Sequence, residues 1–192
     1  MHEVFEDFLE PLMLSGGTAP ISEAYRIDGS KPKKPSMRAR AKFGTLMCCD
    51  YLLTDCKTII EDTCIEGTIK SIEEEYYAIN DNKKRAAFVR KRIRYENCLK
   101  VYGTMLVLCQ LKEWPAQYEF WLVFPGSPDL TKVVDRFGGY SQLAKEIYEE
   151  LGYESKNQST TEGALRSAKL VSKVRVMPEA EFRKRLDEAN NN

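Results

Sequence analysis

Residues 83–124 read KKRAAFVRKRIRYENCLKVYGTMLVLCQLKEWPAQYEFWLVF, and the predicted fold is built around this stretch. It begins with seven cations and no acid between Lys83 and Arg94. It then becomes the most apolar part of the chain, in two short runs separated by a bend at residues 112–116. Short apolar runs rich in Leu, Val and aromatic residues on either side of a turn are typical of paired strands. We therefore expect residues of about 104–124 to form a short antiparallel β-hairpin.

The basic part of this stretch, residues 83–99, leaves two interpretations open. The turn Asn80-Asp81-Asn82 can cap a helix that begins there, and Tyr95, Leu99 and Tyr102 are spaced as on one helical face. The same residues alternate between apolar and basic in a way that also suits a strand. A helix is the favoured interpretation.

The segments on either side of the hairpin show mostly helical spacing. In residues 41–64 the apolar positions are three or four residues apart, which predicts one long helix with these residues on its inner face: Leu46, Cys49, Leu53, Cys56 and Ile60. Capping residues predict further helices after Ser127, Ser141 and Ser159, and a last one after Pro178.

A hairpin alone is marginally stable and must pack against helices. We therefore expect an α+β fold, predominantly helical, with helices packed around a short central antiparallel β-hairpin (about 104–124). Residues 41–176 are expected to form a single globular domain. Residues 1–40 are expected to form an N-terminal amphipathic helix and a basic, Pro-rich arm, and residues 177–192 a C-terminal helix and frayed tail.

The N-terminal helix expected over residues 2–14 has an apolar face with two possible uses. The face can dock on the body of the same chain, or it can enter the groove of a partner protein. Docking is favoured, because terminal apolar helices usually find cover in their own fold. The partner-binding alternative assigns the contact to four residues: Phe5, Phe8, Leu9 and Leu12.

Charge is balanced overall but divided into blocks. The chain has 29 basic and 29 acidic residues, so no net field draws it toward nucleic acid or membrane. Residues 31–42 nevertheless carry six bases and no acid. We expect this segment and residues 83–94 to bind the phosphate backbone of RNA or DNA with little sequence preference. The expected contacts are Lys31, Lys33, Lys34, Arg38, Arg40, Lys83, Lys84, Arg85, Arg90, Lys91, Arg92 and Arg94.

Internal pairing offers an alternative use for the cations of residues 83–94. The acidic helix expected over residues 68–79 is joined to them by a short turn, so the two helices should pack antiparallel. Glu73–Glu75 would then lie opposite Arg85–Lys91 and neutralise much of their field. The sequence leaves external binding and internal pairing open.

Catalytic and metal-binding signals are weak, so we expect a non-enzymatic protein without cofactor, metal or small-molecule substrate. The only histidine is His2, and the six cysteines contain no C-x-x-C pair. The common nucleotide-binding glycine motifs are absent. A metal-dependent nuclease of the Asp…Glu-x-Lys type needs a strand that carries Glu-x-Lys, and neither expected strand has this pattern.

Two functions remain. The first is nucleic-acid binding through backbone contacts. The second is a viral or phage structural or assembly subunit, matrix- or capsid-like, that forms homo-oligomers through its terminal segments and touches RNA or an anionic membrane surface. The sequence lacks the pattern of a signal peptide or a transmembrane segment, and its cysteines suit a reducing compartment. We therefore expect an intracellular protein, cytoplasmic or nuclear, or located in the host cell or virion if a virus encodes it.

Overall fold

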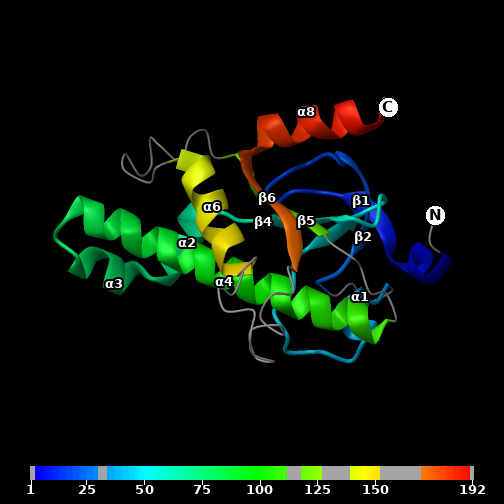
Figure 1. Cartoon of the computed structure of the whole chain (residues 1–192). Coiled ribbons are helices and arrows are strands. Elements are labelled where there is room, and N and C mark those ends of the chain that lie inside the picture. The colour runs from blue at the N-terminus through cyan, green and yellow to red at the C-terminus, as the bar shows by residue number, and fades with distance from the viewer. Residues whose placement is uncertain (1–2, 30–33, 112–117, 127–138, 152–169, 191–192) are drawn as a thin grey trace, which may run out of the picture.

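The structure is a computed structural model, and it describes residues 3–29, 34–111, 118–126, 139–151 and 170–190 (Figure 1). Six strands in these ranges form one mixed sheet in the order β1-β2-β3-β4-β5-β6. The strands are β1 (Leu9–Leu12), β2 (Ser22–Arg26), β3 (Tyr51–Leu53), β4 (Thr58–Asp62), β5 (Tyr118–Phe124) and β6 (Val171–Pro178). Neighbours from β1 to β4 are antiparallel, whereas β4–β5 and β5–β6 are parallel.

The described helices surround this sheet. They are the 3₁₀ helix η1 (Glu3–Phe8), α1 (Met37–Arg40), α2 (Ile65–Ser71), α3 (Glu73–Ala78), α4 (Asn82–Gln110), α6 (Gly139–Leu151) and α8 (Glu179–Asn190). Figure 1 shows α4 and α6 on one side of the sheet and α8 on the other. None of the described helices has the length and apolar character that crossing a bilayer requires.

The expected central hairpin is wrong. Thr104–Gln110 forms the last turns of α4, and β5 pairs in parallel with β4 and β6 instead of antiparallel with residues 104–111. The strand expected at the second apolar run is confirmed as β5. The favoured helix at residues 83–99 is also confirmed, and it continues for another eleven residues beyond Leu99, to Gln110.

Residues 41–64 do not form the long helix that their spacing predicts. They contain β3 and β4, which form an antiparallel hairpin of their own. Ile59 packs in the cluster beneath α4, and the adjacent Ile60 packs in the cluster beneath α8. Because this sheet is covered on both faces, consecutive residues of a strand are apolar, and such a run mimics helical spacing.

Each face of the sheet has its own hydrophobic cluster. On the α4 face, Val89 and Ile93 of α4 and Leu143 of α6 pack with Ile59 and Phe120. On the α8 face, a second cluster joins the helix to the central strands through Phe182, Leu186, Ile60, Trp121 and Val123. The two layers hold the central strands between helices, as in other folds with parallel strand pairs.

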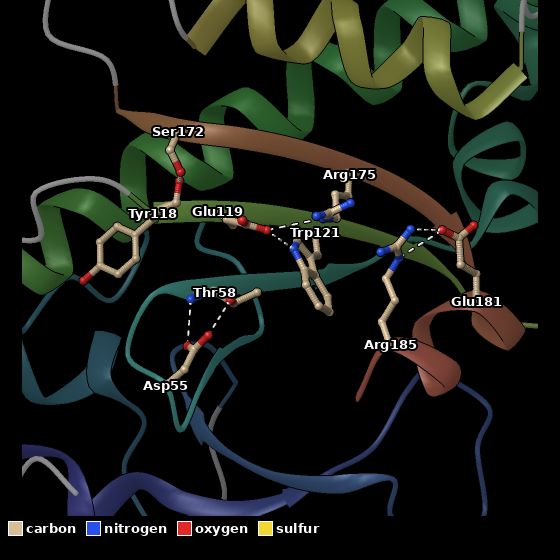
Figure 2. Close-up of polar contacts among 9 residues, drawn as sticks. All are labelled: Asp55, Thr58, Tyr118, Glu119, Trp121, Ser172, Arg175, Glu181 and Arg185. Carbon is tan, nitrogen blue, oxygen red and sulfur yellow. Dashed lines mark hydrogen bonds and ion pairs between the residues drawn. The ribbon is translucent and has the colours of Figure 1, made fainter. Parts of the chain in front are cut away.

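Polar contacts along β5 and β6 reinforce the α8 face (Figure 2). Glu119 accepts hydrogen bonds from Trp121 Nε1 at 3.0 Å and from Arg175 Nε at 3.3 Å. The Trp121 ring meets Phe182 of α8 edge-on, with centroids 6.1 Å apart. These contacts tie β5, β6 and α8 together on the face opposite α4.

Both terminal segments pack within this fold. The N-terminal segment forms η1 and β1 rather than one amphipathic helix, and α8 buries its apolar edge on the sheet. The sheet therefore draws strands from each of the three segments expected from the sequence, 1–40, 41–176 and 177–192. Of the helices expected from capping residues, α6 and α8 are confirmed. The stretch from Val171 is strand β6, not helix, and the helix expected after Ser127 lies outside the described residues.

Candidate functional site

Two carboxylates face each other across the β3–β4 hairpin. The register pairs Tyr51 with Ile60 and Leu52 with Ile59, so one step further places Asp50 opposite Glu61. Directly opposed residues in antiparallel strands lie on the same face with Cβ atoms about 5 Å apart. Asp50 is held there through its main chain, because its N–H donates to the Ile60 carbonyl at 3.1 Å. Its Oδ2 accepts the Asp62 N–H at 3.1 Å.

Helix α4 brings a lysine to the same place. Lys100 Nζ forms a hydrogen-bonded ion pair with Glu61 Oε1, although the two residues are 39 positions apart in the sequence. One turn further along α4, Thr104 Oγ1 accepts the Cys49 N–H at 2.9 Å. Helix α4 is therefore fixed to β4 and to the segment that leads into β3.

A glycine makes this close approach possible. A Cβ atom built on Gly103 would lie 1.9 Å from the carbonyl oxygen of Met47. Gly103 has an ordinary helical position, so it is needed here for close packing and not for an unusual backbone angle. The expected hairpin begins directly after Gly103, whereas the structure places this glycine inside α4, facing the segment that leads into Asp50.

The site is electrostatically unbalanced. Glu61 is fully buried, with a relative exposure of 0%, and its Oε2 atom has no hydrogen-bond partner. Burial and the nearby Asp50 raise the pKa of Glu61 well above its usual value, against the opposing effect of Lys100. Burial, followed by the charge of Asp62, raises the pKa of Asp50 to about 6. Two carboxylates thus share one lysine in a dry environment.

Lys100 keeps its charge in this environment. Burial alone would lower the pKa of its ammonium group, but the charge and hydrogen bond of Glu61, together with Asp50, outweigh that effect and raise it. The upward pKa shifts of the two carboxyl groups have the opposite meaning, because they show that the negatively charged forms are disfavoured at this site. A further positive charge near Asp50 and Glu61 would relieve this resistance.

The two carboxylates do not by themselves make a metal site held entirely by protein. Among the described residues, no group of three or more His, Cys, Asp or Glu side chains is arranged to hold a metal ion. Mg²⁺ usually keeps several waters and takes one or two carboxylates, with substrate phosphates completing its shell. Asp50 and Glu61 are two adjacent carboxylates, and the unpaired Oε2 atom of Glu61 is buried away from solvent.

A pocket of about 270 Å³ opens beside Lys100. It lies beyond the carboxyl end of β4, where the chain passes into α2. One wall comes from the connection between β4 and α2, and the other comes from α4. Its lining residues are Asp62, Thr63, Cys64, Gly67, Thr68, Ser71, Glu96, Asn97 and Lys100. Asp62 and Lys100 connect this pocket to the carboxylate pair.

The cations expected in the N-terminal arm are partly engaged within the fold. Arg38 forms an ion pair with Asp28 at 2.8 Å and donates to the Leu46 carbonyl. Arg40 pairs with Asp7 at 2.9 Å. Lys34 is exposed, while Lys31 and Lys33 lie outside the described residues. The structure therefore does not bring the arm together as one cationic surface.

The cations of α4 divide into two groups. Arg90 pairs with Glu146 of α6 at 3.0 Å, and Arg92 pairs with Glu96 of its own helix at 2.5 Å. Arg85 donates to the Ile79 carbonyl at 2.5 Å and lies over the Tyr76 and Tyr77 rings. The second group is exposed or half-buried and consists of Lys83, Lys84, Lys91 and Arg94.

The expected pairing with Glu73–Glu75 is therefore not how these arginines are held. Helix α3 does pack beside α4, as the short turn predicted (Figure 1). The tyrosines of α3, and not its glutamates, meet Arg85. The ion pairs of Arg90 and Arg92 go to α6 and to α4 itself.

The apolar residues expected to bind a partner are part of the core. Phe5, Phe8 and Leu12 are buried, and Leu9 packs against the same cluster as Phe5 and Phe8. The Phe5 ring packs on Tyr25 of β2 with centroids 5.5 Å apart. Contact with a partner through these side chains would require the core to open.

Little in the sequence pointed to the carboxylate site. Asp50 and Glu61 lay in a segment expected to be helical, and no pattern linked either of them to Lys100. A signal was present in the run TIIED, in which a carboxylate directly follows apolar residues with a strong strand preference. A charged residue at the end of a buried strand is a common position for functional groups.

Comparisons of the chain with protein-family models, with curated proteins and with solved structures found no match.

Proposed function

We propose that this protein is a Mg²⁺-dependent phosphodiesterase that acts on nucleic acid at Asp50, Glu61 and Lys100. The observation that carries the proposal is the buried Asp50–Glu61 pair with one unpaired carboxylate oxygen and a lysine delivered by α4. The proposal keeps the expected nucleic-acid partner. It departs from the expectation of a non-enzymatic protein, because the Glu and Lys of an Asp…Glu-x-Lys site need to meet in space and not in one strand.

Each group has a distinct role in this proposal. Asp50 and Glu61 would hold Mg²⁺, which when bound would polarise a phosphoryl oxygen and make water more acidic. Lys100 holds its ammonium group beside Glu61 and stabilises the negative charge that develops on the phosphoryl group. Water adds to phosphorus, the bond from phosphorus to the leaving oxygen breaks, and that oxygen takes up a proton.

The exposed cations of α4 support a polyanionic substrate. Lys83, Lys84 and Lys91 lie on the same helix as Lys100. At about 1.5 Å per residue, Lys91 and Lys84 are about 14 and 24 Å along the axis from the site. At about 100° per residue, Lys91 and Lys84 lie on the opposite side of α4 from Lys100, so they attract a polyanion to the helix without lining a path to Lys100. Such contacts give affinity without sequence preference.

A cleavage assay with labelled single- and double-stranded RNA and DNA tests the proposal. We expect cleavage in Mg²⁺ or Mn²⁺ and none in EDTA. Asp50→Asn, Glu61→Gln and Lys100→Met should each reduce the rate by about a hundredfold or more. Glu181→Gln on α8 is the matched control, because Glu181 makes a surface ion pair with Arg185 on the other side of the sheet (Figure 2).

Two outcomes would count against the enzyme. Cleavage that persists in EDTA or in Glu61→Gln would place the activity elsewhere. Binding of all four nucleic acids without cleavage of any would instead favour a non-enzymatic binding protein.

A further inference from the structure

We propose that the outward face of α4 is a binding surface for single-stranded nucleic acid. Two tyrosines on this face, Tyr95 and Tyr102, stack on bases. Two lysines on the same face, Lys84 and Lys91, contact phosphates. The inference goes beyond the proposed function, because this surface lies on the side of α4 away from Lys100 and needs neither metal nor cleavage.

The four side chains follow one line along the helix. They are separated by seven, four and seven residues, so at about 100° per residue all four point within about 40° of one another. The same rule directs them away from Lys100. Along the axis they extend over about 27 Å, with the two lysines nearer the start of α4 and the two tyrosines nearer its end. A strand that lies along this face can therefore contact all four.

The aromatic part of this face is open to solvent. Tyr95 is 58% exposed and Tyr102 is 41% exposed. Leu99 and Leu106 lie beside them on the helix and are also exposed. Apolar side chains that gather on one exposed face commonly mark an interaction site. A tyrosine ring can stack on any base, because every base has a flat π-face.

The charge of α4 favours a polyanion as the occupant. The helix contains eight basic residues and a single acid, Glu96. Glu96 is already paired with Arg92 of the same helix. The side chains of Lys84 and Lys91 are exposed, so they can approach phosphates without breaking the core. Lysines combined with exposed rings are the features by which proteins bind single strands without sequence preference.

Phosphates and bases are expected at different ends of the face. Burial first, and then Cys98 and Glu150, raise the pKa of Tyr102, so a carboxylate of α6 lies within electrostatic reach of this ring. That carboxylate disfavours a phosphate beside Tyr102 but has little effect on a neutral base. We therefore assign phosphate contacts to the two lysines and base contacts to the two tyrosines.

A second copy of the chain fits this face less well. A complete aromatic side chain buries at most about 250 Å². The four exposed apolar side chains from Tyr95 to Leu106 are on average about half exposed, so they offer less than about 500 Å². A standard protein interface buries about 800 Å² on each partner. Two parallel copies of α4 would also bring their lysines together.

Fluorescence anisotropy in EDTA tests the surface without cleavage. The probes are a labelled oligodeoxythymidine strand, which does not pair with itself, and a labelled DNA duplex of equal length. Tyr95→Ala and Tyr102→Ala should each weaken binding of the single strand about fivefold or more. Neither should affect the duplex, whose bases are already stacked on one another. Replacing Lys84 and Lys91 together by alanine should weaken binding of both probes.

Three further variants separate stacking from a structural role. Tyr95→Phe keeps the ring and should bind the single strand like the native chain. Tyr95→Leu keeps an apolar side chain without a ring and should bind as weakly as Tyr95→Ala. Tyr77→Ala is the matched control, because Tyr77 is 59% exposed but lies on α3 beside Arg85. It should keep native affinity for both probes.

Several results would overturn the inference. They are failure of the native chain to bind the single strand, native affinity in Tyr95→Ala or Tyr95→Leu, and equal losses on single strand and duplex in Tyr95→Ala. A native dimer that becomes a monomer in Tyr95→Ala, measured by analytical ultracentrifugation, would also overturn it, because the face would then join two copies. None of these results bears on the proposed enzyme, which is judged by cleavage in Mg²⁺ and its loss in Glu61→Gln.

Discussion

Asp50 is a carboxylate whose burial works against folding when no metal is bound. Its pKa is raised from 3.8 to about 6, first by burial and then by Asp62. Between these two pH values the folded state binds more protons than the unfolded state. This group therefore makes the protein less stable as pH rises from about 4 to about 6, and the loss persists above that range.

The first prediction follows from this shift. In EDTA, Asp50→Asn should raise the free energy of unfolding at pH 7.5 by up to about 3 kcal/mol, the equivalent of roughly two pKa units. At pH 4 the two proteins should differ little. Urea denaturation at half-unit steps of pH measures the difference. A native chain that equals or exceeds the variant at pH 7.5 would contradict the burial of a charged Asp50.

The second prediction concerns the replacement of Gly103. Alanine is favoured over glycine within a helix by about 1 kcal/mol, but here its Cβ would meet the Met47 carbonyl at 1.9 Å. We expect Gly103→Ala to be destabilising by about 1–3 kcal/mol, as overpacked cores are. It should also reduce cleavage, because α4 can relieve the clash only by moving Lys100. Gly44→Ala is the control, since a Cβ atom there would meet nothing within 4 Å. If the free energy of unfolding of Gly103→Ala equals that of the native chain, α4 packs less closely against the Met47 segment than the structure shows.

At the residue level the sequence could not reveal the site. Glu61 and Lys100 are 39 residues apart, and the pair forms only because β3, β4 and α4 assemble around Gly103. Local spacing carries information about neighbours within an element, whereas this pair depends on tertiary packing. The absence of Glu-x-Lys from one strand therefore said little about the assembled chain.

Helix α4 packs against the sheet, carries the lysine of the proposed site and presents exposed cations. Its inner face packs through Val89 and Ile93, and its later turns hold Lys100 and Asn97. The sequence predicted the first half of this helix from its capping turn. It did not predict the second half, because Thr104–Gln110 consists mostly of apolar residues that suit a buried strand equally well.

The third prediction separates the two groups of α4 cations. Replacing Lys83, Lys84 and Lys91 together by alanine should weaken nucleic-acid binding for all sequences. The slope of log affinity against log salt should fall by about 0.7–0.9 for each phosphate that the variant no longer neutralises. Unfolding should be unaffected, because these side chains are exposed.

Arg90→Ala is the comparison for that triple variant. Arg90 joins α4 to Glu146 of α6, and both side chains are largely buried, with 24% and 15% exposed. Its loss should lower the free energy of unfolding by about 1–3 kcal/mol, because Glu146 loses its charged partner. Fluorescence anisotropy and urea denaturation distinguish the two effects. A triple variant with native affinity and native salt slope would exclude these lysines from the binding surface.

Sequence patterns did not predict strands β3 and β4 or the pairing of β5. β3 and β4 lie between two layers of helices, so Ile59 and Ile60 are both buried and the alternation expected of a strand disappears. β5 was recognised because its apolar run is bounded by Pro125-Gly126. Its partners could not be inferred, since parallel pairing depends on segments distant in the sequence.

Within the complete fold, the site lies at the strand where the pairing in the sheet changes from antiparallel to parallel. β4 is antiparallel to β3 and parallel to β5. Glu61 and Asp62 stand at the carboxyl end of β4, and α2, α3 and α4 make the crossover that returns the chain to β5. Sheets with parallel strands commonly bind ligands beyond the carboxyl ends of those strands. The topology thus places the carboxylate pair, Lys100 and the pocket together.

The fourth prediction concerns the divalent metal that the proposed activity requires. Titration of the chain with Mn²⁺, followed by the electron paramagnetic resonance signal of the free ion, measures binding without any substrate. The native chain should bind Mn²⁺ at a site from which Mg²⁺ displaces it. Glu61→Gln and Asp50→Asn should each lose that site, while Glu181→Gln should retain it. Mn²⁺ binding that is absent from the native chain, or that is unchanged in Glu61→Gln, would contradict the assignment of Asp50 and Glu61 as metal ligands.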